Sequence, residues 1–182
     1  MNKLKLLTVI VFGALLVTFS SCDKVSSLGN VTFDASLSSD ISATSAGETR
    51  TSDYAFSGSA VIDPSSDENI NKYWDNLVSW SIQKVTLKIK SISQDATLTE
   101  GHLVVKDNNT QDTLFTANAT NFPLTVGTTI LEVTEGEWAG VESALMAQHS
   151  LFASIDGSLD QPNVDVTFNI ILDSKITASP LQ

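Results

Sequence analysis

One cysteine, Cys22, occurs among the 182 residues of this chain. An internal disulfide is therefore excluded, and packing must stabilise the fold even in an oxidising compartment. Histidine is almost as scarce, since His102 and His149 are the only two, and the sequence contains no Gly-Xaa-Ser-Xaa-Gly elbow and no phosphate-binding glycine loop. Serine and aspartate are plentiful, so a catalytic triad is not excluded, but these shortages favour a protein that is not an enzyme.

Basic residues are the second shortage. The chain has 10 Lys and Arg against 21 Asp and Glu, which gives a net charge of −11 at pH 7. Such a surface repels phosphate backbones, so we expect no nucleic-acid partner. The one basic cluster follows a strand pattern, with Lys84, Lys88 and Lys90 on one side and Leu87 on the other. We interpret it as a solvated strand face, paired with acidic neighbours, and not as an anion-binding site.

Long apolar runs are limited to one, at the N-terminus. Residues 6–19 are almost continuously apolar after the cationic start at residues 1–5, and Ser20 and Ser21 then lead into Cys22. The run is shorter than the about 20 residues that a membrane-spanning helix needs. It has the arrangement of a secretory signal, with a cationic region followed by an apolar region.

The stretch Phe19-Ser20-Ser21-Cys22 resembles the lipobox of a bacterial lipoprotein signal. The resemblance implies that a peptidase cuts after Ser21, that the Cys22 thiol carries a diglyceride, and that its new amine is acylated, for example with palmitate. Two or three acyl chains, at about 0.8 kcal/mol per buried methylene, hold a protein durably at a membrane. It also implies an exported protein anchored in the bacterial cell envelope, at the outer membrane. The alternative is an ordinary secretory signal that leaves Cys22 as a free thiol.

Small acidic lipoproteins of this kind resemble uncharacterised all-β envelope proteins of the Bacteroidetes. Cleavage before Cys22 leaves 8 basic and 21 acidic side chains, a net charge of −13. That phylum attaches O-glycans to exported proteins at Asp-Ser/Thr-aliphatic triplets, and Asp112-Thr113-Leu114 fits the pattern. The resemblance therefore implies that Thr113 is a glycosylation site.

Three parts follow from the composition: a signal over residues 1–21, a lipidated cysteine with a flexible tether over 22–30, and a single domain over 31–182. Apolar and polar residues alternate at both ends of the domain, over residues 31–41 and 164–172. This period of two predicts half-buried strands, and it recurs about eight times along the chain.

Two stretches have apolar residues at helical spacing instead, each after a capping box, Ser65 with Glu68 and Thr134 with Glu137. The first helix is expected to continue through Val78, and the second to end near His149. About eight strands and two short helices predict an all-β, antiparallel β-sandwich, of either immunoglobulin-like or jelly-roll type.

Calcium is the inorganic ligand that the acidic loops favour, because it takes carboxylate and carbonyl oxygens. The candidate ligands lie in three places along the chain: Asp63 and Asp67, Asp107 and Asp112, and Asp156 and Asp160. The alternative is that these residues are turn formers and helix caps. No other cofactor is expected.

Among the tryptophans, Trp80 is the candidate for stacking against a sugar, because it lies where the first helix meets a strand. Trp74 and Trp138 lie on the apolar sides of their helices, and packing is the alternative for Trp80 too. His102 falls on the polar side of a strand pattern, and His149 falls at a helix end, where its charge suits the helix dipole.

An anchor, a tether and a rigid domain with free end loops favour a non-enzymatic binding or interaction module at the envelope, with an unknown protein or glycan partner. One alternative is a structural subunit of a surface assembly, in which an unpaired edge strand accepts a donor strand. Another is an envelope hydrolase with His102 or His149 in its pocket.

Overall fold

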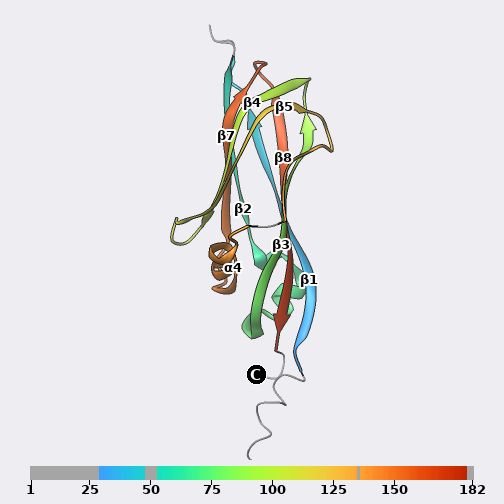
Figure 1. Cartoon of the computed structure of the whole chain (residues 1–182), viewed down its shortest axis with the longest axis vertical. Helices are drawn as coiled ribbons and strands as arrows, with labels where there is room; N and C mark the ends of the chain where they lie inside the picture. Colours follow the sequence, from blue (N-terminus) through green and yellow to red (C-terminus); the bar gives the residue numbers. More distant parts are fainter. Residues whose placement is uncertain (1–28, 48–52, 135, 180–182) are drawn as a thin grey trace, which may run out of the picture.

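Alternating side chains build eight strands in the computed structural model, which describes residues 29–47, 53–134 and 136–179 (Figure 1). The predicted signal, Cys22 and residues 23–28 of the tether lie outside the described residues. The strands are β1 (Val31–Thr44), β2 (Tyr54–Ile62), β3 (Leu77–Ile92), β4 (Ala96–Asp107), β5 (Thr113–Leu124), β6 (Thr129–Val133), β7 (Leu151–Leu159) and β8 (Asp165–Ala178). The helices are α3 (Glu68–Lys72) and α4 (Ala139–Met146), with short 3-10 turns η1 (Pro64–Ser66) and η2 (Trp74–Asn76).

Two antiparallel four-stranded sheets make the sandwich. Sheet A has the order β1-β8-β3-β6, and sheet B has the order β2-β7-β4-β5. The pairs β1·β8, β2·β7, β3·β6 and β4·β5 are all antiparallel, so the chain is one long nested hairpin that has been rolled up. This winding is a jelly roll, and it decides between the two sandwich types that the sequence left open.

The predicted strand periodicity is confirmed in β1 and β8. Leu37 and Ile41 of β1 and Phe168 of β8 point inward and are buried, whereas the residues between them in β1 are mostly exposed. Phe168 stacks on Phe56 of β2 with ring centroids 5.8 Å apart, which joins the two sheets across the core. Burial of such side chains contributes about 1.5–3 kcal/mol each, so this layer carries much of the stability.

Helices cover the end of sheet A that sheet B does not reach. The strand β1 pairs with β8 from Val31 to Thr44, whereas β2 has only nine residues. Ile70 of α3 is completely buried there, and Tyr73 lies 5.6 Å from Phe33 of β1, measured between ring centroids. Figure 1 shows α4 beside the same half of the sandwich, toward the C-terminus. No helix within the described ranges is long and apolar enough to cross a bilayer.

The first predicted helix was too long. The helix α3 ends at Lys72, and Leu77 and Val78 already belong to β3. Leu77 pairs with Ala178 of β8, so strand pairing took precedence over a helical spacing that continued by coincidence. The predicted capping box was also wrong, because the side chain of Asp67 accepts the hydrogen bonds of the first turn in place of Ser65.

The second predicted capping box was wrong too. The helix α4 begins at Ala139 after Trp138, with no side-chain cap, and ends at Met146 before His149. Trp138 is buried and lies 5.0 Å from Phe115 of β5, measured between ring centroids. A buried indole therefore stands at the N-cap position of α4, where the sequence predicted a capping side chain.

Candidate functional site

A row of polar side chains crosses the outer face of sheet B. Ser57 of β2, Asp156 of β7, His102 of β4 and Asn118 of β5 occupy matching register positions on the four strands. Their alternation with buried neighbours places all four on the solvent side of the sheet. Glu100 lies two residues before His102 and joins the row through its imidazole.

A hollow is formed at this row, and Gly157 is part of its lining. Ser57, Glu100, His102 and Asp156 line the hollow together with Gly157. A Cβ atom on Gly157 would lie only 2.0 Å from the carbonyl oxygen of Glu100, so no other residue fits this position without moving the strands. The register of β4 on β7 shifts between Leu98 and Glu100, which brings that carbonyl close.

His102 is held from both ring nitrogens. Its Nδ1 lies 2.8 Å from Oδ1 of Asn118, and its Nε2 lies 3.0 Å from Oε1 of Glu100. The Asn118 hydrogen bond, opposed by partial burial, together with the charges of Glu100 and Asp156 raises the pKa of His102 above its ordinary 6.5. A ring with both nitrogens bonded is oriented to present charge and is poorly placed to accept a substrate proton.

Chemically, the hollow presents two carboxylates, an oriented imidazole and a serine hydroxyl on a rigid sheet. The two carboxylates attract an ammonium or guanidinium group, and they and the serine oxygen can accept its hydrogen bonds. The row could not be recognised from sequence, because its members come from four strands whose register only the fold defines. The one available signal was that each member falls on the polar side of its strand pattern.

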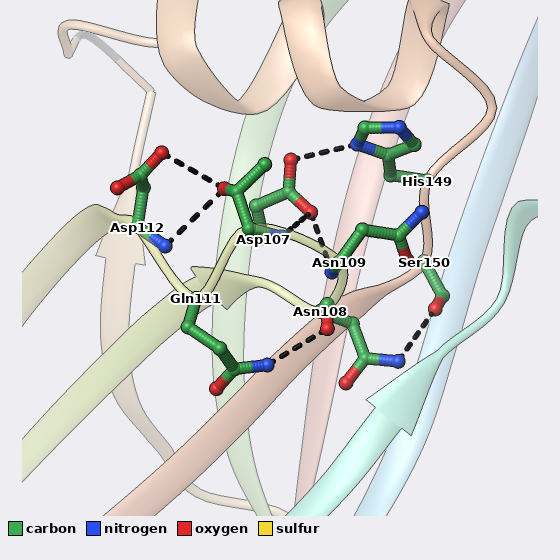
Figure 2. Close-up of polar contacts among 8 residues, drawn as sticks. Asp107, Asn108, Asn109, Gln111, Asp112, His149 and Ser150 are labelled. Atoms are coloured by element: carbon green, nitrogen blue, oxygen red, sulfur yellow. Dashed lines mark hydrogen bonds and ion pairs between the residues drawn. The ribbon is translucent and has the colours of Figure 1, made fainter.

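A second polar cluster closes the turn between β4 and β5 (Figure 2). The carboxylate of Asp107 accepts hydrogen bonds from the backbone N–H groups of Asn109 and Thr110, at 2.7 and 3.2 Å. Its other oxygen lies 2.8 Å from Nδ1 of His149. Asn108 donates from its side chain to Oγ of Ser150 at 3.1 Å, which ties the turn to the start of β7.

The charge of Asp107 is stabilised by this network. Burial alone would raise its pKa, but the hydrogen bonds from His149, Asn109 and Thr110 outweigh burial and hold the pKa below 3.8. His149 therefore has a structural partner, and no hydroxyl is hydrogen-bonded to either histidine among the described residues. The cluster therefore serves to hold the β4–β5 turn in place through hydrogen bonds.

Most of the six carboxylates proposed for calcium accept hydrogen bonds from backbone N–H groups. Asp63 accepts from the N–H of Ser65, Asp67 caps α3, and Asp160 accepts from the N–H of Thr97 at 2.7 Å. The remaining three lie in the two clusters already described: Asp107 and Asp112 in the turn and Asp156 in the hollow. Within the described ranges no three acidic, histidine or cysteine side chains come together as a metal site. Calcium binding at the three pairs stays a prediction, and four of the six carboxylates already accept hydrogen bonds from backbone N–H groups.

The predicted role of Trp80 in stacking against a sugar is wrong. Trp80 is only 4% exposed and points into the core, so neither face of its indole is available to a ligand. Thr113, the implied glycosylation site, is exposed at the first position of β5. Two of the lysines on β3 are paired as expected, Lys84 with Asp173 at 3.6 Å and Lys90 with Asp40.

No protein-family model matches the chain, and no curated protein matches it. Solved structures with a similar outline include the decameric BFDV capsid protein, which is 11% identical with a TM-score of 0.41 over 80% of this chain and 99% of that chain. The desmodium yellow mottle tymovirus structure is 12% identical with a TM-score of 0.35 over 85% of this chain and 86% of that chain. The turnip yellow mosaic virus structure is 8% identical with a TM-score of 0.35 over 84% of this chain and 97% of that chain. TM-scores below 0.5 do not establish a shared fold. The strand order alone defines this chain as a jelly-roll β-sandwich protein.

Proposed function

We propose that this chain is a lipid-anchored protein of the bacterial cell envelope that binds a protein partner without catalysing a reaction. The observation that carries the binding role is the hollow on sheet B, where Glu100, His102 and Asp156 gather on a rigid surface. The partner it suits carries a lysine or arginine, since two carboxylates flank the site and the chain as a whole is acidic.

The position of the domain relative to an anchor supports this role. Val31 at the start of β1 pairs with Ala178 at the end of β8, so the domain is entered and left at one end (Figure 1). A lipid on Cys22 would therefore hold this end toward the membrane. The outer face of sheet B would then stand to the side and remain accessible to a partner.

The choice of a protein over a glycan rests on the aromatic residues. Sugar recognition relies on an exposed aromatic face, and Phe56, the phenylalanine that lines the hollow, is buried. Trp80 and Trp138 are buried as well, and Trp74 is partly buried against the core. The choice of binding over hydrolysis rests on His102, whose two ring nitrogens are both occupied by hydrogen bonds. His149 is likewise used by the turn through Asp107.

Photo-crosslinking on cells of the source bacterium tests the binding role. A benzophenone amino acid replaces Ser57, in the hollow, or Ser42, an exposed serine on the outer face of sheet A. The proposal expects a discrete crosslinked protein from position 57 that is absent from position 42 and is lost with Glu100→Gln and Asp156→Asn. Equal products from both positions, a carbohydrate product, or no product from position 57 would overturn it.

Fractionation tests the anchor separately. The wild type should sediment with membranes, and Cys22→Ala should move to the soluble envelope fraction. Membrane association that survives Cys22→Ala would refute the lipid anchor without affecting the binding site.

A further inference from the structure

The two long sides of the sandwich differ, and one of them is closed. Here β1 and β2 lie against each other, and the N–H of Ala46 donates to the carbonyl of Ala55 at 2.8 Å. A Cβ atom on Gly58 of β2 would lie 2.6 Å from the carbonyl oxygen of Ser42 and 2.9 Å from Cγ2 of Ile41. Strands this close leave no room for another strand between them.

The opposite side, between β5 and β6, is open. Among the described residues, β5 pairs with β4 alone, and β6 pairs with β3 only from Val85 to Lys88. Ala117 and Ala119 of β5 face Leu131 of β6 across a narrow apolar opening into the core. These three side chains are half-buried, so apolar surface at this side is left uncovered.

Other edges of the sheets are guarded. The part of β3 beyond β6 is covered by α4, whose Glu142 accepts a hydrogen bond from the N–H of Ile82 at 2.9 Å. The edge strand β6 is five residues long and carries the exposed Glu132, and β1 carries Asp34 and Asp40. Short length, charge and side-chain capping are the means by which proteins prevent edge pairing.

The strand β5 has none of these protections beyond its first residues, where Leu114 and Phe115 lie against Gly140 and Trp138 at the start of α4. Its twelve residues, Thr113–Leu124, include no Asp, Glu, Lys or Arg, in a chain of net charge −11. Two copies of so acidic a protein repel each other, and the repulsion is weakest where an uncharged edge meets an uncharged edge. Ala117 and Ala119 are also small enough to let two backbones approach.

We propose that β5 of one copy pairs antiparallel with β5 of a second copy about a twofold axis, which joins the two B sheets into one eight-stranded sheet. Antiparallel pairing of a strand with itself is self-complementary, as a twofold interface requires. The pairing covers residues 114–120 with the axis at Ala117, because Asn121 has a φ of +52° and Pro123 has no N–H to donate. It brings the two hollows onto one continuous face, and it depends on neither the lipid anchor nor the binding role.

Site-directed crosslinking of the full-length chain in cells tests the proposal. Thr116 is exposed on β5, and Ser59 is its counterpart on the outer face of β2, at the closed side. Thr116→Cys and Ser59→Cys are each treated with a short bismaleimide, which spans the about 7–8 Å between diagonal neighbours of an antiparallel pair. Both variants retain Cys22, so its background is common to the two.

The proposal expects a crosslinked dimer from Thr116→Cys at several times the yield from Ser59→Cys. Adding Thr120→Lys to Thr116→Cys should reduce that dimer several-fold, because a lysine on each edge strand opposes strand addition. A matched Ser59→Lys addition, on the closed side, should leave the dimer unchanged. Equal yields from both cysteines, insensitivity to Thr120→Lys, or a product that contains a different protein would overturn it.

Discussion

His149 donates a hydrogen bond from Nδ1 to the carboxylate of Asp107 across 2.8 Å, and this bond joins two segments that are 42 residues apart. Asp107 ends β4 on the inner side of its strand, whereas His149 follows α4, so the bond pins the β4–β5 turn under the helix (Figure 2). An ionised side chain at this buried position is stable only because three donors surround it.

Asp107→Asn should lower the free energy of unfolding by about 1.5–3 kcal/mol, because a buried charged acceptor loses its charge while its donors remain. Asp112→Asn, in the same turn, is the matched control, since Asp112 is exposed and its side chain accepts from the Thr110 hydroxyl and from no backbone N–H among the described residues. It should change stability by no more than about 0.5 kcal/mol. Urea unfolding measures both, and equal losses would contradict the role assigned to Asp107.

Acid should remove the contribution of Asp107. Its folded pKa lies below 3.8, so its carboxylate stabilises the fold fully above that value, and the stabilisation is lost as the pH falls through the folded pKa. The difference in unfolding free energy between the wild type and Asp107→Asn should therefore shrink between pH 7 and the acid limit of folding. A difference that stays constant across this range would show that the charge is not responsible.

His102 should titrate above 6.5 when its ring protons are followed by NMR. The Asn118 hydrogen bond is the largest cause, so Asn118→Ala should bring the pKa down toward 6.5, and Thr116→Ala in the same strand should not. Because the folded pKa is raised, the stabilisation is fully present below 6.5 and is lost as the pH rises through the folded value. A pKa at or below 6.5 in the wild type would contradict the geometry of the hollow.

Gly157→Ala should destabilise the fold by at least about 1–3 kcal/mol and flatten the hollow, because the new Cβ would overlap the backbone of Glu100. Gly140→Ala is the comparison. Its Cβ would lie in ordinary contact, 3.4 Å from Leu114, and alanine favours the helix by about 0.5–1 kcal/mol. The midpoint temperature of thermal unfolding should therefore fall for Gly157→Ala and stay the same or rise for Gly140→Ala. Similar midpoints for the two variants would refute this account.

The fold class could be predicted from sequence because alternation is local. Strands such as β1 and β8 are encoded by neighbouring residues whose polarity changes at every step, and the structure places them as expected. The helix boundaries could not be predicted this way. Leu77 continued a helical spacing but found a partner in Ala178, which is a hundred residues away and invisible to any local pattern.

The candidate site could not be predicted from sequence at all, because it too depends on contacts between residues far apart in the chain. Asp156 was proposed as a calcium ligand and His102 as a solvated strand residue, and nothing in their spacing joins them. Register brings them side by side on neighbouring strands. Trp80 was proposed as an exposed ring, but its pairing with Ile176 turns it into the core.

By itself the sequence determined that this chain is acidic, lacks an internal disulfide and builds an antiparallel sandwich of about eight strands. These properties depend on composition and on the period of two, which need no knowledge of long-range contacts. Only the tertiary structure decided the jelly-roll winding, the hollow around His102 and the unguarded edge of β5. Each of these is a relationship between segments far apart in the chain, fixed by the register of strands that meet only when the sandwich closes.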